Sequence, residues 1–271
     1  MSNPIHVISL GAGVQSSTMA LMAAKGEITP MPVAAVFADT QAEPRNVYDW
    51  LDWLEPHLPF PVLRVTSGPL MATLTTHRHR EDGTGTYIRQ SIPAWVDAGG
   101  RASILMRGCT RDYKTTPIVR AVKKLMREHG AKSVVQWIGI SLDEAHRMKD
   151  SGDRRIQHRW PLIDARVTRQ KCLEWMQQQG YPKPPRSACV FCPHHSDVEW
   201  RALKNGDPAS FQTAVDAERL LQDAVMRSTA PTARAIPFLH KSLKPLDQVD
   251  FTEDTSQLNL FGNECEGMCG V

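Results

Sequence analysis

The feature that most constrains the fold is an alternation of short apolar runs with amphipathic segments. Residues 5–10, 33–37, 61–65 and 134–140 are apolar runs of strand length, and residues 16–25, 44–57, 115–129 and 168–179 have helical character. Strands that alternate with helices form βαβ units, whose strands pair in parallel under helices on both faces. The sequence therefore predicts an α/β fold, with a doubly wound, mainly parallel sheet.

The C-terminal part of the chain has a different character. Two further helices are expected at residues 196–204 and 208–226, and from residue 228 onward Pro, Thr and Ser dominate without periodicity. We expect one nucleotide-binding domain over residues 1–205. A helical extension and a cysteine-containing, irregular tail follow over residues 206–271.

Residues 10–17, LGAGVQSS, join the first predicted strand to the first predicted helix. Ligands bind such sheets beyond the C-terminal ends of the strands. Glycines allow close backbone approach, and the N–H groups at a helix start bind anions. The loop is neither a Walker loop nor GxGxxG, because no lysine follows the glycines and Gln-Ser-Ser follows Gly13. It predicts a phosphate site, with a plain strand–helix turn as the alternative.

Residues 187–197, SACVFCPHHSD, hold a CxxC pair followed by a proline and two histidines. In a reducing compartment, clustered cysteines are more typical of metal sites or catalytic thiols than of disulfides. Three interpretations follow: a zinc site, an iron–sulfur cluster or a redox dithiol. The residue spacing alone favours zinc and iron–sulfur equally. A zinc set would comprise Cys109, Cys189, Cys192 and His194 or His195.

Five ordered segments carry the pattern of a known family. They are GAGVQS at 11–16 (SGGxDS), FADTQAEP at 37–44 (FxDTGxEP), CTRDYKTTP at 109–117 (CxxxxKxxP), GISLDEAHR at 139–147 (GxRxxESxxR) and WPLID at 160–164 (PLxDW). Together they resemble the PAPS (phosphoadenylyl sulfate) reductase-like family of the adenine-nucleotide alpha-hydrolase, or PP-loop ATP pyrophosphatase, superfamily. Gln15 stands where the motif has Asp, and Ser141 where it has Arg.

The resemblance implies the site residues. The phosphates would lie at residues 11–17 and the adenosine near Asp39. The implied nucleotide-binding residues are Ser9, Gly11, Ala12, Gly13, Gln15, Ser16, Ser17, Asp39, Thr40 and Gly139. Lys114 and Arg147 are implied as catalytic cations. For Arg111, a position in the site and a solvated surface position are equally supported.

The cysteine pattern is similar to that of the iron–sulfur branch of this family. The resemblance favours a 4Fe-4S cluster on Cys109, Cys189 and Cys192, with zinc as the alternative. The fourth iron is either open or bound by Cys269 or Cys265. The tail NECEGMCGV, residues 263–271, is similar to the ECGLH tail of PAPS reductases. It implies that Cys265 is a nucleophile, a persulfide carrier or a cluster ligand; a disordered tail is the remaining alternative.

Three functions fit the resemblance. The first is an ATP- and Mg²⁺-dependent sulfur-transfer enzyme that releases AMP and pyrophosphate, supplied by a sulfur donor such as a cysteine desulfurase. Its acceptor would be a nucleic acid, since CVFCPHHSDVEW resembles the matching region of DNA-phosphorothioation enzymes. The candidate contacts are Arg78, Arg80, Arg154, Arg155 and Arg159, with a solvated charged face as the alternative.

The second function is a sulfonucleotide reductase that uses Cys265 and a thiol donor such as thioredoxin to release sulfite. The third is a nucleotide-binding or cluster-sensing module without catalysis. The net charge of +3 is compatible with an anionic partner. No signal peptide and no apolar run of membrane length is recognisable, so we expect a cytoplasmic protein without a membrane partner. The sequence leaves a homodimer open.

Overall fold

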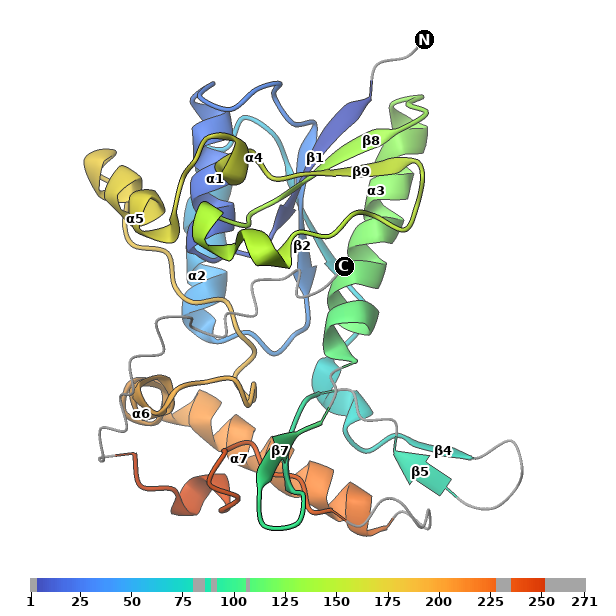
Figure 1. Ribbon diagram of the computed structural model, residues 1–271, viewed down its shortest axis with the longest axis vertical. Helices are drawn as coiled ribbons and strands as arrows, with labels where there is room; N and C mark the ends of the chain where they lie inside the picture. Colours follow the sequence, from blue (N-terminus) through green and yellow to red (C-terminus); the bar gives the residue numbers. More distant parts are fainter. Residues whose placement is uncertain (1–3, 80–85, 89–91, 106–107, 228–234, 252–271) are drawn as a thin grey trace. The chain divides into compact units, whose positions relative to one another are not determined.

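The computed structural model describes residues 4–79, 86–88, 92–105, 108–227 and 235–251. A five-stranded sheet in the order β3-β2-β1-β8-β9 forms its centre, and every pairing in it is parallel (Figure 1). The strands are β1 (Ile5–Leu10), β2 (Ala34–Asp39), β3 (Val62–Thr66), β8 (Val134–Ile138) and β9 (Ile156–Arg159). This strand order confirms the doubly wound fold that the resemblance to PAPS reductase-like proteins implied.

The parallel register places the C-terminal ends of the inner strands at one edge of the sheet. Leu10 of β1 is opposite Phe37 of β2, and Ser9 is opposite Ile138 of β8. The chain continues from β1 to β2 on one side and reaches β8 on the other, so the strand order reverses between β1 and β8. Doubly wound sheets bind their ligands at such a switch point.

Helices cover both faces of the sheet, as the alternating pattern predicts (Figure 1). On one face, α1 (Val14–Ala24), α2 (Arg45–Leu54) and α5 (Arg169–Gln178) enclose a core with Leu10, Phe37 and Trp137. On the other face, α3 (Thr116–Glu128) packs on a core with Val7, Val36 and Ile138. Helix α1 is buried along Val14 to Ala23, which explains its apolar and small side chains. A short helix, α4 (Pro161–Asp164), follows β9.

The described residues group into two compact units. The first comprises residues 4–67 and 110–188 and contains the sheet; the second comprises 68–109 and 189–251. These units differ from the sequence-based division at residue 205, which treated the chain as consecutive blocks. Short 3₁₀ turns occur at Glu55–His57, Leu70–Thr73, Leu142–Arg147 and Leu246–Gln248, and a π-helix at Thr110–Thr115.

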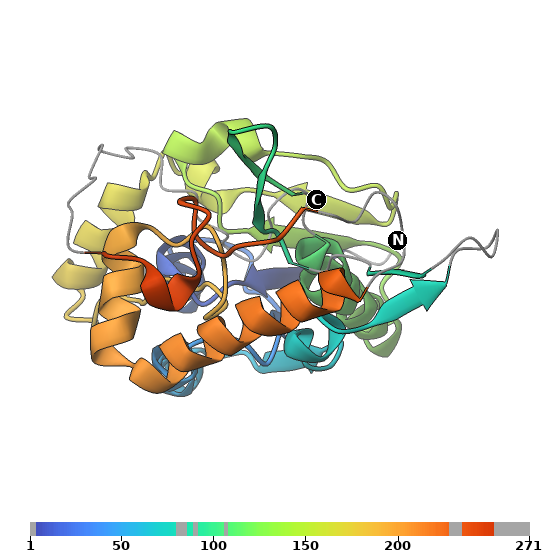
Figure 2. The same cartoon turned by 90° about the horizontal axis from the view of Figure 1, so that it is seen from below.

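The second unit combines two hairpins with two helices. The hairpins are β4 (His77–His79) with β5 (Thr86–Ile88) and β6 (Trp95–Asp97) with β7 (Ala102–Ile104). The helices are α6 (Asp197–Gly206) and the long α7 (Pro208–Met226), drawn in orange in Figure 2. Backbone hydrogen bonds in both directions join Trp95 to Phe238 and so tie the β6–β7 hairpin to the chain after α7.

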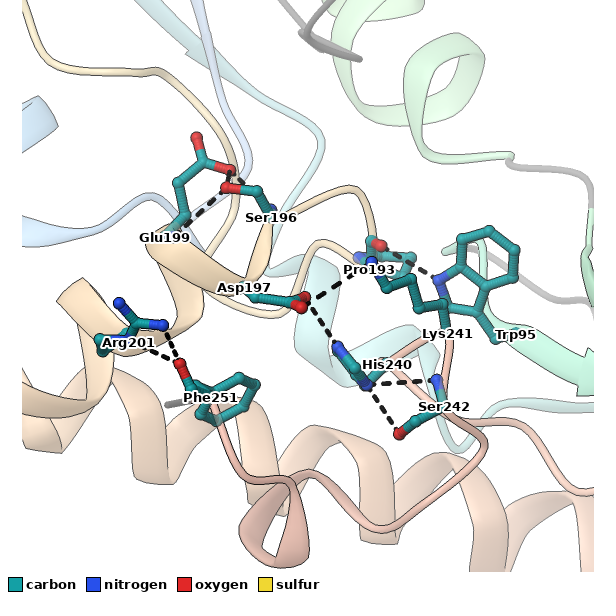
Figure 3. A network of polar contacts seen from close by, with 10 residues as sticks. All are labelled: Trp95, Pro193, Ser196, Asp197, Glu199, Arg201, His240, Lys241, Ser242 and Phe251. Atoms are coloured by element: carbon teal, nitrogen blue, oxygen red, sulfur yellow. Dashed lines mark hydrogen bonds and ion pairs between the residues drawn. The ribbon is translucent and has the colours of Figure 1, made fainter. Parts of the chain in front are cut away.

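Polar contacts hold the start of α6 in place (Figure 3). Ser196 caps the helix in a reciprocal capping box with Glu199. The nearly buried His240 lies between Asp197 Oδ1, 3.0 Å from its Nε2, and Ser242 Oγ, 2.7 Å from its Nδ1. Trp95 Nε1 donates to the carbonyl oxygen of Pro193 at 3.1 Å. The segment after the CxxC pair is therefore fixed from several sides.

Glu218 on α7 provides a testable link between pH and stability. Its buried carboxylate accepts the backbone N–H groups of Leu239 and Leu246, each at 2.7 Å. Burial raises the pKa of Glu218 above its ordinary value of 4.5, against the lowering effect of these two donors. A raised folded-state pKa means that the free energy of unfolding falls as pH rises from 4.5 through the folded-state pKa.

We expect Glu218→Gln to remove this pH-dependent loss in urea unfolding curves measured across that range. At low pH the variant should be less stable by about 1 kcal/mol, because its amide NH₂ group accepts no hydrogen bond from a backbone N–H. A variant that retains the wild-type pH dependence would show that Glu218 does not cause it.

Among the helices that the structure describes, none is long and apolar enough to cross a membrane.

Candidate functional site

The loop between β1 and α1 ends at an open helix N-terminus. Ala12 has a positive φ of 58°, and Gly13 precedes the helix in extended conformation. In the described residues, no side chain caps α1 and no acidic residue lies in its first turn. The first N–H groups of a helix have no partner within the helix and carry partial positive charge, so this end of α1 can bind an anion.

Three serines that the resemblance implied as nucleotide-binding residues make hydrogen bonds within the protein. Ser16 Oγ accepts the Gly11 N–H at 3.1 Å, and Ser17 Oγ accepts Trp50 Nε1 at 2.9 Å. Ser9 Oγ accepts Gln136 Nε2 at 2.6 Å. All three serines are buried. The backbone N–H groups at the start of α1 have no partner within the helix and are donors that the loop can offer to a ligand.

Gly139 brings the loop after β8 against the start of α1. A Cβ atom built on Gly139 would lie 2.8 Å from Ser16 Cα and 2.9 Å from Ser16 N. Only a residue without a side chain permits this backbone approach. Two of the segments predicted from the sequence thus meet at the switch point of the sheet.

Gln15 connects these loops to α5. It is fully buried, and its Nε2 lies 3.1 Å from Glu144 Oε2 and 3.4 Å from Ser141 Oγ. Its Oε1 accepts Arg169 Nη1 at 3.0 Å. Glu144 Oε1 in turn pairs with Arg147 Nη1 at 2.5 Å. The side chains form a continuous chain: Arg169, Gln15, Glu144 and Arg147.

Arg147 was predicted as a site residue, and the structure places it in this network. The sequence analysis missed Arg169 and Glu144 as partners of Gln15. Arg169 belongs to none of the recognised segments and lies 154 positions after Gln15. The sequence held one indication of these partners: Glu144 is the acidic residue of the segment that resembles GxRxxESxxR.

Residues after β2 form a second polar group. Asp39 Oδ1 accepts the Gln41 N–H at 2.7 Å and the Tyr48 hydroxyl at 2.8 Å. Partial burial, and then the hydrogen bond to the Asp39 carboxylate, raise the pKa of Tyr48 well above its ordinary value of 10.0. Tyr48 therefore stays a neutral donor, and Asp39 is oriented at the C-terminal end of β2.

Lys114 forms a buried ion pair with Glu43. Nζ lies 3.7 Å from Glu43 Oε1, and the two side chains are 5% and 1% exposed. The Thr40 hydroxyl also contacts Glu43 Oε1, at 3.4 Å. Lys114 lies in the π-helix before α3, a distortion that is common at functional sites. The ion pair brings together the predicted segments 37–44 and 109–117.

The other predicted cations that the structure describes lie at or near the surface. Arg111 is mostly exposed and pairs with its neighbour Asp112 at 2.9 Å. Arg155 pairs with Asp153, Arg159 with Asp164, and Arg154 is exposed. The Arg78 side chain and Arg80 lie outside the described residues. For Arg111, this placement fits the solvated alternative.

Cys109, Cys189 and Cys192 of the predicted metal site lie in the second unit. Cys189 is buried, and Cys109 and Cys192 are partly exposed. The Cys192 N–H donates to the Cys189 carbonyl at 2.9 Å, so the CxxC pair forms a tight turn. His195 packs against the Trp200 ring, with centroids 4.6 Å apart.

Within the described residues, no group of three or more His, Cys, Asp or Glu side chains is arranged to hold a metal ion. The described donors therefore do not fit a cluster or a zinc ion by themselves. Cys265 and Cys269 lie outside these residues. The 4Fe-4S cluster stays a prediction of the sequence. Iron, sulfide and zinc analysis of anaerobically purified protein distinguishes the two metals.

Comparisons with known proteins give only distant likenesses. No family model matches the chain, and no curated protein matches it. Among solved structures, PAPS reductase from Candida auris in a phosphate complex is similar over 68% of this chain and 76% of its own, with 13% identity and a TM-score of 0.41. The U34-tRNA thiolase NcsA from Methanococcus maripaludis, with its 4Fe-4S cluster, is similar over 81% and 73%, again with 13% identity and a TM-score of 0.41. These likenesses are too distant to carry an argument, and the fold assignment rests on the strand order of the chain itself.

Proposed function

We propose that the chain is an enzyme that binds ATP or a related adenine nucleotide, with the phosphates at the N-terminus of α1, and uses it to activate an acceptor for sulfur transfer. The observation that carries the proposal is the meeting of the open α1 N-terminus with the loop after β8, where Gly139 abuts Ser16. This meeting lies at the switch point between β1 and β8, the position at which doubly wound sheets bind nucleotides.

The charges around this position suit a polyphosphate. Arg147 and Arg169 contribute two guanidinium groups that can donate to phosphate oxygens, and the helix end adds partial positive charge. When an acceptor oxygen attacks the α-phosphorus, the bond to the bridging oxygen breaks and pyrophosphate leaves with the electron pair. Fixed donors at this position would stabilise the charge that develops on the leaving group.

In the proposed sequence, the adenylated acceptor is then attacked by a sulfur nucleophile, and AMP is released. The five motif segments support this class of reaction, and we propose a nucleic acid as the acceptor. The source of the sulfur is a separate donor such as a cysteine desulfurase. Its delivery through Cys265 as a persulfide is part of the proposal, although the tail lies outside the described residues. The outer sulfur attacks the adenylated acceptor as AMP leaves, and a thiol reductant then cleaves the disulfide between the acceptor and Cys265.

The second candidate is a sulfonucleotide reductase, which the similarity of the tail around Cys265 favours. In that reaction the thiolate attacks the sulfur of the sulfonucleotide, and the nucleotide phosphate leaves. A thiol donor such as thioredoxin then attacks the resulting thiosulfonate at the Cys265 sulfur, and sulfite is released. This candidate requires the same nucleotide site but no pyrophosphate release.

One experiment separates the candidates. In one arm, the full chain is incubated with ATP, a cysteine desulfurase, cysteine and either duplex DNA or transfer RNA. In the other arm, it is incubated with PAPS and reduced thioredoxin. Pyrophosphate, AMP and sulfite are measured in both arms. We expect pyrophosphate release that Arg147→Gln lowers at least roughly 10-fold, the loss of one charge-assisted interaction. The exposed Lys124→Gln on α3 is the control for the loss of a positive charge. Sulfite from PAPS without pyrophosphate from ATP would contradict sulfur transfer, and nucleotide binding without either product would support a non-catalytic module.

A further inference from the structure

We propose that Arg169 is a phosphate-positioning residue of this site, and that Arg147 and Arg169, rather than a protein-bound Mg²⁺ ion, neutralise the nucleotide phosphates. The inference rests on the proposed function, because it concerns the nucleotide site described above. The sequence predicted that Mg²⁺ neutralises the phosphates. In this proposal, the two arginine side chains do so.

The orientation of the Gln15 side chain is set by the chemistry of its partners. Arg169 carries only donors, so the Gln15 group that meets Nη1 at 3.0 Å is the carbonyl oxygen. Its NH₂ group then faces the Glu144 carboxylate at 3.1 Å. Because Gln15 is fully buried in the first turn of α1, it holds Arg169 at the helix start.

The neutrality of Gln15 decides the local charge. The network contains the cations Arg147 and Arg169, the anion Glu144 and the neutral amide, and the Asp143 carboxylate beside the Arg169 backbone balances the second cation. An acidic residue at position 15 would make the local formal charge negative. It would also place a second carboxylate next to Glu144, where like charges repel.

The carboxylates near the helix start are already used by the protein. Glu144 bonds to Gln15 and pairs with Arg147, and Asp143 Oδ1 accepts the backbone N–H of Arg169 at 3.0 Å. Mg²⁺ prefers carboxylate oxygens together with phosphates and waters. The residues at this position therefore do not fit a protein-held Mg²⁺ ion, whereas two arginines suit phosphate oxygens.

The test measures binding of ATP and of inorganic pyrophosphate by calorimetry, in EDTA and in Mg²⁺. We expect wild-type protein to bind both ligands in EDTA. Arg169→Gln should weaken binding in EDTA roughly 10- to 100-fold, because a charge-assisted contact is lost. Gln15→Glu should weaken it by a similar factor in EDTA and regain affinity in Mg²⁺, since the new carboxylate pair can hold the ion.

Lys171→Gln, an exposed charge change on the same helix α5, is the matched control and should bind like wild type. Thermal unfolding reports whether each variant is folded, and the Mg²⁺ dependence is a readout that loss of structure alone does not produce. Wild-type affinity in Arg169→Gln, or binding by wild type only in Mg²⁺, overturns the inference while leaving the proposed function standing. Wild-type protein that binds neither ligand under any condition overturns both.

Discussion

Lys114→Met is expected to lower the free energy of unfolding by about 3–5 kcal/mol. The lysine is the partner of Glu43 in a pair whose side chains are almost completely buried. Methionine fills a similar volume but carries no charge, so the Glu43 carboxylate would stay buried without this cation. Urea unfolding of the full chain, followed by a probe of the sheet-containing unit, measures the loss.

The control for this prediction is the exposed pair Lys124–Glu128 on α3, at a comparable 3.6 Å. Lys124→Met should change stability by less than about 1 kcal/mol, because water screens that pair. Glu43→Leu in the Lys114→Met background should recover most of the lost stability, since both charges are then gone. A single Lys114→Met variant as stable as Lys124→Met would show that the ion pair is not desolvated as the structure describes.

The second large effect is expected at Gly139. Gly139→Ala should destabilise the protein by about 1–3 kcal/mol, because the added methyl group meets the backbone of Ser16 at 2.8 and 2.9 Å and a helix backbone yields little. The same displacement would move the start of α1, so we also expect weaker nucleotide binding. Chemical unfolding and calorimetry measure the two effects separately.

Gly152→Ala is the matched glycine control in the same unit. A Cβ atom on Gly152 would meet nothing within 4 Å, and its φ lies outside the left-handed region. The control should leave stability and binding close to wild type. Equal effects at both positions would mean that the close approach of Gly139 to α1 determines neither stability nor nucleotide binding.

The sheet was predictable because its central strands are apolar on both faces. The runs at residues 5–10, 33–37, 61–65 and 134–140 all became parallel strands, and the helices between them follow the expected spacing. β9 was missed because its sequence, IQHR, has one apolar residue, and it pairs only with β8 at the sheet edge. Polar edge strands give little periodic signal.

Only part of the candidate site could be predicted from the sequence. The loop after β1 and the segment after β8 could be placed at one edge from strand order alone. The contact of Gln15 with Arg169 could not, because it joins residues that no local pattern links. Likewise, the glycine-interrupted region from residue 66 to 108 gave no hint that it would pack with residues 189–251. The roles of the cysteines remain predictions.

The division of the second unit between two distant parts of the chain affects how the protein is made. Residues 68–109 leave the ribosome well before residues 189–251, with which they form one compact unit. At typical synthesis rates the intervening residues 110–188 take roughly 4–16 s to be added. During this delay the two hairpins and Cys109 are without their final neighbours. Chaperones that bind at this stage of synthesis would therefore bind the segment from residue 68 to 109, and the Cys109 thiol in it would be open to reaction.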